Sequence, residues 1–132
     1  MDPNSLSVAL QGEEATADLL LASLQLPVQP SFEAQDQEDF FRLQITWIQE
    51  KIRGSTPEWR KKFIKAITGH PFLAPGKRLS IEGVAQTPRL LEAHTCFNSL
   101  WLTAPRDPDL RVTREVFEIE LDQLIEASYN GA

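Results

Sequence analysis

The sequence predicts one domain of mixed α/β (α+β) class, in which a small sheet packs with several helices. Its 132 residues, 42% of them hydrophobic and 24% charged, suffice to bury a single core without disulfides. Several segments repeat apolar residues every three or four positions, as helices do when one face is buried. Two shorter segments alternate polar and apolar residues, which is typical of half-buried strands.

The first two helices are expected before Gly54. Thr16 can cap a short helix over Leu19–Leu24, and Pro27 prevents that helix from continuing. A longer helix is expected over residues 37–53. Its apolar face is formed by residues at spacings of four, three and four: Phe41, Ile45, Ile48 and Ile52.

A third helix is expected between Thr56 and Gly69. The Thr56 hydroxyl can cap its first turn, Pro57 fits the first helical position, and glycine is common just after a helix. Because only a short turn separates the second and third helices, we expect them to pack as an antiparallel pair. A strand with alternating residues, Arg78–Glu82, follows and is expected to end at Gly83.

The last predicted elements are a strand over Asn98–Leu102 and a C-terminal helix. In the strand, Leu100 and Leu102 share one face. Thr113 can cap the helix, and residues 129–132 are expected to form a short tail. The apolar side of the helix is expected to contain one stripe with two neighbouring residues: Phe117, Leu121 and Leu124, with Val116 and Ile125 beside them.

Between the two strands, the stretch Ala93–Asn98 contains the only cysteine, Cys96, and one of the two histidines, His94. Its conformation depends on where the strand that holds Leu100 begins. If the strand runs unbroken from His94, Cys96 shares the buried face of Leu100 and is inert. If the strand begins after Cys96, the thiol lies on a loop and can be exposed.

The residues alone leave the role of this thiol open. A lone cysteine more often packs in a core than reacts. An ordinary thiol, with a pKa of about 8.5, is mostly protonated near neutral pH and needs a suitable environment to become a nucleophile. His94, two positions from Cys96, either activates the thiol or only packs against the loop. For a papain-like pair with a distant histidine, only His70 is available, and a surface position suits it better.

Composition and charge argue against several classes of function. The net charge is −6 and no basic run is interleaved with aromatic residues, so we expect no nucleic acid partner. No apolar run approaches the roughly 20 residues of a spanning helix, so we expect no membrane association. No set of ligand residues indicates a metal, and no motif indicates a cofactor. Because one cysteine cannot form an internal disulfide, we expect a free thiol and an intracellular location, cytoplasmic or nuclear. We also expect a monomer.

The run Leu90–Leu102 closely resembles the active-site segment of HECT-type ubiquitin ligases. Members of that family carry an alanine- or serine-His-Thr-Cys-Phe-Asn run, followed by two alternating leucines. Here Ala93–Asn98 matches the run. Two positions depart from the family pattern, since Leu91 and Thr103 stand where the family has prolines. These departures leave the preferred lysine or chain type open, but not the thioester step.

Two helical segments add to the resemblance. Lys62–Gly69 looks like the family's segment that ends in phenylalanine-valine-threonine-glycine, and Asp18–Leu20 with Phe40–Trp47 is similar to the start of the family's C-terminal lobe. On this basis residues 15–132 are expected to be a catalytic domain like the HECT C-lobe, and residues 1–14 a tail or a remnant left from cloning. Since no N-lobe segment is recognised, we expect a fragment of a longer ligase.

The resemblance implies an α/β lobe whose small sheet is mostly antiparallel, with Cys96 on a loop before a strand. It implies that Cys96 accepts ubiquitin from a ubiquitin-conjugating enzyme as a thioester and passes it to a lysine of a substrate protein. Thr95 and Phe97 are then expected to position the thiol and the ubiquitin tail. His94 and Asn98 complete the motif as supporting residues.

Further residues are expected to contact ubiquitin or the neighbouring lobe: Leu100, Trp101, Leu102 and Tyr129. Tyr129 is fourth from the end of the sequence, where many members of the family carry a phenylalanine that docks during transfer. Two alternatives to the ligase stay open. One is a non-catalytic module of the same fold that binds ubiquitin or a partner, and the other is a small cysteine hydrolase.

Overall fold

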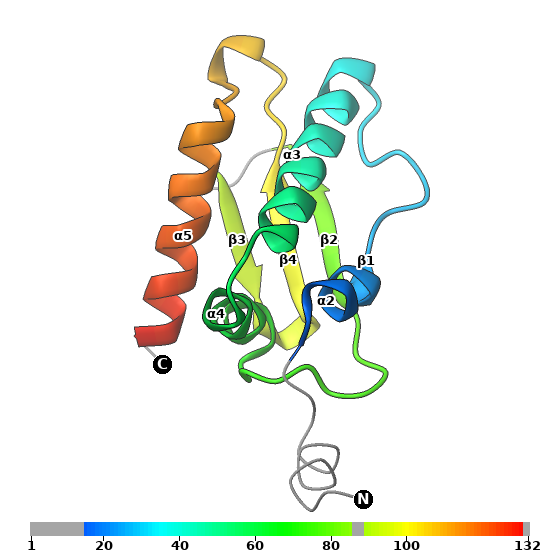
Figure 1. Ribbon diagram of the computed structural model, residues 1–132. Coiled ribbons are helices and arrows are strands. Elements are labelled where there is room, and N and C mark those ends of the chain that lie inside the picture. Colours follow the sequence, from blue (N-terminus) through cyan, green and yellow to red (C-terminus); the bar gives the residue numbers. More distant parts are fainter. Residues whose placement is uncertain (1–14, 86–88, 131–132) are drawn as a thin grey trace, which may run out of the picture.

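The computed structural model describes residues 15–85 and 89–130, with side chains described as far as residue 127. In chain order, the elements labelled in Figure 1, together with the two 3₁₀ turns η1 and η2, are α2 (Ala17–Ser23), β1 (Leu24–Gln25), α3 (Gln35–Arg53), α4 (Pro57–Thr68), β2 (Leu79–Val84), β3 (Leu91–His94), η1 (Thr95–Phe97), β4 (Ser99–Thr103), η2 (Pro108–Leu110) and α5 (Arg114–Asn130). Helices and strands are mixed along the chain, which confirms the predicted α+β class.

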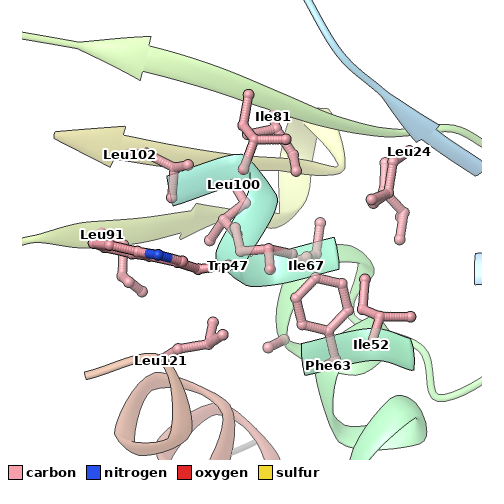
Figure 2. Packing of buried hydrophobic residues seen from close by; sticks show 14 of the residues in the cluster. Leu24, Trp47, Ile52, Phe63, Ile67, Ile81, Leu91, Leu100, Leu102 and Leu121 are labelled. Atoms are coloured by element: carbon pink, nitrogen blue, oxygen red, sulfur yellow. The ribbon is translucent and has the colours of Figure 1, made fainter. Parts of the chain in front are cut away.

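The long helices pack on one face of a four-stranded sheet. In Figure 1, α3 lies in front of the strands and α5 lies alongside β3. α3 contacts β4, α4 contacts both β3 and β4, and α5 contacts β3. Figure 2 shows the buried side chains that meet between these elements, among them Trp47, Ile52, Phe63, Ile67, Leu91, Leu100, Leu102 and Leu121.

The strand order of the sheet is β1-β2-β4-β3. β1 pairs with β2 and β2 pairs with β4 in parallel, whereas β3 and β4 form an antiparallel hairpin. The expectation of a mostly antiparallel sheet is therefore wrong. The reason is the position of each strand in the sheet. β3 lies at the edge and is antiparallel to β4, and β4 lies between β3 and β2. β4 therefore has the same direction as β2 and pairs with it in parallel. The parallel strands β1 and β2 are joined by a crossover through α3 and α4.

The predicted caps begin α2 and α4. The Thr16 hydroxyl accepts a hydrogen bond from the Leu19 amide at 3.1 Å, and the Thr56 hydroxyl accepts one from the Trp59 amide at 3.1 Å. Gly69 ends α4 with a φ of 87°, a left-handed conformation that suits glycine. The two-residue strand β1, which follows α2 directly, has no counterpart among the predicted elements.

α3 and α4 do not form the expected antiparallel pair. Figure 1 shows α4 end-on and α3 from the side, so the two helices cross. α4 buries a broad face, made of Phe63, Ile64, Ala66 and Ile67, and it contacts β3, β4, η1 and α5. α4 therefore packs mainly against those elements, and Figure 1 shows it beside the C-terminal end of α3. α3 itself begins at Gln35, two residues before the expected start.

α5 contributes to the core three residues that are spaced four apart: Phe117, Leu121 and Ile125. Leu124, which was expected in this stripe, is only partly buried, and Val116 is 41% exposed. The buried residues of α5 are therefore those spaced four apart along the helix, and the helix packs against α4 and β3. The helix continues to Asn130, so the tail expected from Tyr129 onward is wrong for its first two residues.

β2 continues through Gly83 to Val84, beyond its expected end. A Cβ atom at Gly83 would lie 2.6 Å from the Phe32 ring and 3.2 Å from the Phe41 ring. The two rings meet edge-on, with their centroids 5.7 Å apart. Gly83 is therefore explained by the close approach of side chains to the strand, and it does not break the strand.

Candidate functional site

The stretch around Cys96 forms the tip of the β3–β4 hairpin. β3 ends at His94, η1 covers Thr95–Phe97, and β4 begins at Ser99. The antiparallel pairing places His94 opposite Ser99. Of the two predicted alternatives, the structure has the one in which the strand begins after Cys96, and the thiol is free and exposed. β3 itself was not among the predicted elements.

Asn98 closes the turn that carries Cys96. Its φ and ψ are both 49°, and it is the only non-glycine residue with a positive φ in the described ranges 15–85 and 89–130. Asparagine tolerates this left-handed conformation better than most residues do. The Asn98 amide donates to the Thr95 carbonyl at 3.3 Å, and the Asn98 carbonyl accepts from the Ser80 amide of β2 at 2.9 Å. The turn is thus tied to the neighbouring strand.

The side chains of the motif differ in exposure. Thr95, Cys96 and Phe97 are exposed, whereas His94 and Asn98 are partly buried. Phe97 has 72% of its surface in solvent. An exposed phenylalanine beside an exposed thiol offers an apolar contact to any partner that approaches the sulfur.

The four predicted contact residues fall into three groups. Leu100 and Leu102 are fully buried in the core, so the expectation that they contact a partner directly is wrong for their side chains. They fix the position of β4 instead. Trp101 points to the opposite face of the sheet and is partly exposed. Tyr129 lies in the last turn of α5, and its side chain is outside the described residues.

His94 makes its contacts with β3 and β4. Its ring stacks on Trp101, with centroids 3.8 Å apart and planes inclined by 28°. Its Nε2 atom lies 3.3 Å from Glu92 Oε2, two positions earlier on the same face of β3. Trp101 is paired with Glu92 on one side and Glu82 on the other. Neither the stack nor the role of Glu92 was predicted, because both depend on the strand register.

The Cys96 thiol has no hydrogen-bond partner among the residues that the structure describes. Such a thiol, exposed on a turn with a defined backbone, can act as a nucleophile toward a carbonyl carbon carried by another macromolecule. Within the described ranges, no group of three or more His, Cys, Asp or Glu side chains is arranged to hold a metal ion. No helix in the same part of the chain is long and apolar enough to cross a membrane.

A hollow of about 1000 Å³ lies away from the thiol, where Leu90, Thr103, Leu110 and Leu124 are among the lining residues. Thr103 is the last residue of β4, whereas Cys96 precedes the first. The hollow and the thiol are therefore at opposite ends of the same strand and do not form one site.

A protein-family model matches most of this chain. The family model described as HECT-domain (ubiquitin-transferase) matches residues 1–118, a span that includes the whole β3–η1–β4 hairpin. No curated protein matches the sequence. Since the family match covers well over half of the 132 residues, the chain belongs to the HECT-domain family of ubiquitin transferases.

Proposed function

We propose that this chain acts as the C-terminal catalytic lobe of a HECT-type ubiquitin ligase, with Cys96 as the residue that carries ubiquitin. The observation that carries the proposal is the exposed, free thiol at the tip of the β3–β4 hairpin. A structural cysteine is usually buried in the core. In this hairpin the buried large side chains come from the strands on either side of the turn, whereas Cys96 is exposed in the turn itself.

The proposed reaction has two steps. In the first, the Cys96 thiol loses its proton to solvent, and the resulting thiolate attacks the carbonyl carbon of the thioester between ubiquitin and the conjugating enzyme. A new sulfur–carbon bond forms, and the thiolate of the conjugating enzyme leaves. In the second, a substrate lysine amine attacks the same carbon, an isopeptide bond forms, and the Cys96 thiolate leaves. The proton released by the amine passes to solvent or to a base.

The neighbours of Cys96 have distinct proposed roles. Phe97, with its exposed ring, offers an apolar contact to the ubiquitin tail. Thr95, exposed and next to Cys96 in the sequence, is proposed to help position the thiol, and Asn98 sets the backbone of the turn. Tyr129 is proposed to contact ubiquitin or the acceptor from the end of α5. None of these groups has to supply the chemistry, because positioning of two reactants contributes much of a transfer rate.

A thioester assay tests the proposal. The chain is incubated with ubiquitin, its activating and conjugating enzymes, and the N-terminal lobe of a HECT ligase. We expect a ubiquitin adduct that a reducing agent removes and that Cys96→Ala abolishes. Cys96→Ser should give an adduct that resists the reducing agent, because an oxygen ester replaces the thioester. Val28→Ala, at a position 96% exposed and outside the hairpin, serves as the matched control.

The same assay separates the alternatives. Binding of ubiquitin without any adduct under these conditions would favour the non-catalytic module. Turnover of a ubiquitin-tail ester without an acceptor amine would favour the cysteine hydrolase. In a simpler measurement, a small thiol reagent should label Cys96 in the folded protein as fast as it labels the unfolded chain. Labelling only after denaturation would contradict the exposed position of the sulfur.

A further inference from the structure

His94 has a contact pattern that separates two possible roles next to the thiol. The residue is the last of β3, so it stands where the strand enters the turn that carries Cys96. Its ring face is occupied by Trp101 at a centroid distance of 3.8 Å, and its Nε2 edge faces Glu92 at 3.3 Å. Among the described residues, no hydrogen bond joins His94 to Cys96.

The stack ties the two strands together at the base of the turn. His94 is paired with Ser99, and Trp101 lies two residues further along β4, so the rings form a diagonal contact across the hairpin. Diagonal pairs of large rings stabilise an antiparallel pair. The turn from Thr95 to Asn98 therefore starts from a strand end that is held by ring packing and finishes at a carbonyl held by Ser80.

Trp101 is held in the same way. Its Nε1 atom is buried and makes no hydrogen bond within the part of the chain that the structure describes. The indole is therefore kept in place by ring packing with His94, with the carboxylates of Glu82 and Glu92 on the neighbouring strands. Loss of the His94 ring would free the indole and the end of β3 together.

From these contacts we propose that His94 is a positioning residue, which holds the Cys96 turn through its stack on Trp101 and does not act on the thiol itself. The proposal deepens the proposed function and rests on it for the transfer step. It makes a sharp distinction between the ring and its nitrogens. An aromatic ring without nitrogen should replace the histidine, whereas a small side chain should not.

The test compares His94→Phe with His94→Ala, and uses His70→Ala at the other histidine as the control. We expect His94→Phe to form the ubiquitin thioester within about threefold of the wild-type rate, because two apolar rings stack as well. His94→Ala should be slower by roughly 10- to 100-fold, because small displacements of a reacting group reduce rates by such factors. His70→Ala should match wild type, since His70 lies in the exposed segment after α4.

The second readout is the pH profile of Cys96 alkylation by iodoacetamide. The midpoint of this profile changes if the His94 imidazole acts on the thiol, and it does not change if His94 only positions the turn. We expect the profiles of wild type and both His94 variants to have the same midpoint. If both variants instead shift the midpoint to higher pH and lose transfer to the same extent, the imidazole acts on the thiol and the positioning role is wrong.

Amide hydrogen exchange provides a readout that does not require ubiquitin. The amides of Asn98 and Ser80 close the turn, and His94→Ala should speed their exchange by roughly 3- to 10-fold while His94→Phe leaves it unchanged. Unchanged exchange in His94→Ala would overturn the proposal. A wild-type protein that forms no thioester but shows the expected exchange pattern would refute the proposed function alone.

Discussion

Substitution of Asn98 tests whether the backbone of the turn or the asparagine side chain holds Cys96 in place. At φ 49°, glycine is free of strain and asparagine tolerates the conformation. Alanine meets a clash between its Cβ and the following carbonyl that costs roughly 1–2 kcal/mol, and β-branched valine is a stronger outlier. We therefore expect stability to decrease from Asn98→Gly and wild type through Asn98→Ala to Asn98→Val.

The magnitude follows from two competing responses of the alanine variant. It can keep the left-handed backbone and bear the strain of roughly 1–2 kcal/mol. Alternatively, it can become extended and lose two hydrogen bonds, from the Asn98 amide to Thr95 and from the Ser80 amide to the Asn98 carbonyl. Each such bond contributes about 0.5–1.5 kcal/mol, so this route costs about 1–3 kcal/mol. The cheaper response puts Asn98→Ala about 1–2 kcal/mol below wild type, and the second route limits Asn98→Val to about 3 kcal/mol.

Urea unfolding measures these free energies, and the thioester assay measures the consequence for Cys96. Asn98→Asp is the control, because aspartate also tolerates the left-handed region. Asn98→Gly should retain stability and transfer, whereas Asn98→Val should lose part of both. If Asn98→Gly loses as much stability as Asn98→Ala, the side chain of Asn98 matters more than the backbone conformation, and the reasoning is refuted.

Two further predictions concern the packing around the sheet. Gly83→Ala should lower the free energy of unfolding by about 1–3 kcal/mol, because the new Cβ would lie 2.6 Å from the Phe32 ring. In urea unfolding, Gly83→Ala should cost less when it is added to Phe32→Ala than when it is added to the wild type. An equal cost in both backgrounds would contradict the clash. Arg111→Met should destabilise at neutral pH by losing bonds to the Pro105 carbonyl and to Asp36. The bond from Arg111 lowers the pKa of Asp36, so this carboxylate stabilises the fold above its unfolded pKa, and the contribution disappears as pH falls through the folded pKa. The difference in stability between wild type and Arg111→Met, measured by thermal unfolding, should thus become smaller below about pH 4. A difference that becomes larger there would refute the linkage.

Local signals in the sequence predicted the helices well. The caps at Thr16, Thr56 and Gly69 act within one turn of the chain, so residue type and spacing suffice to find them. The buried residues of α3 repeat with the helical period, and they lie in the core as predicted. For β4, the alternation of Leu100 and Leu102 likewise identified the buried face.

Non-local pairing could not be predicted in the same way. β1 is too short to show a period, and it exists because β2 lies beside it. β3 has four residues, and its pairing with β4 follows from the turn at Asn98. The direction of neighbouring strands depends on which position each strand takes in the sheet. A chain whose successive strands alternate in direction can therefore still have parallel neighbours, as β2 and β4 are.

The candidate site was predicted only in part, because some of its contacts also depend on non-local strand pairing. The motif identified Cys96 and its neighbours, and the parity of β4 showed that exposure depended on where the strand begins. The left-handed Asn98 decides that question, since it ends η1 and lets β4 start at Ser99. The contact of His94 with Trp101 needs the hairpin register, which follows from the same turn.

The strand behind the thiol is held at both ends. At its far end, Gln44 donates to the Thr103 carbonyl at 3.0 Å and Gln37 donates to the Ala104 carbonyl at 2.6 Å, and both glutamine side chains are buried on α3. At its near end, Ser80 donates to the Asn98 carbonyl. Cys96 thus lies in a turn, η1, that leads into a fixed strand, and its sulfur has no hydrogen-bond partner among the residues that the structure describes. In the transfer proposed above, the sulfur would meet a conjugating enzyme and then an acceptor lysine. Both properties would favour that transfer, because a fixed backbone reduces the entropy lost in each encounter and an open thiol excludes neither partner.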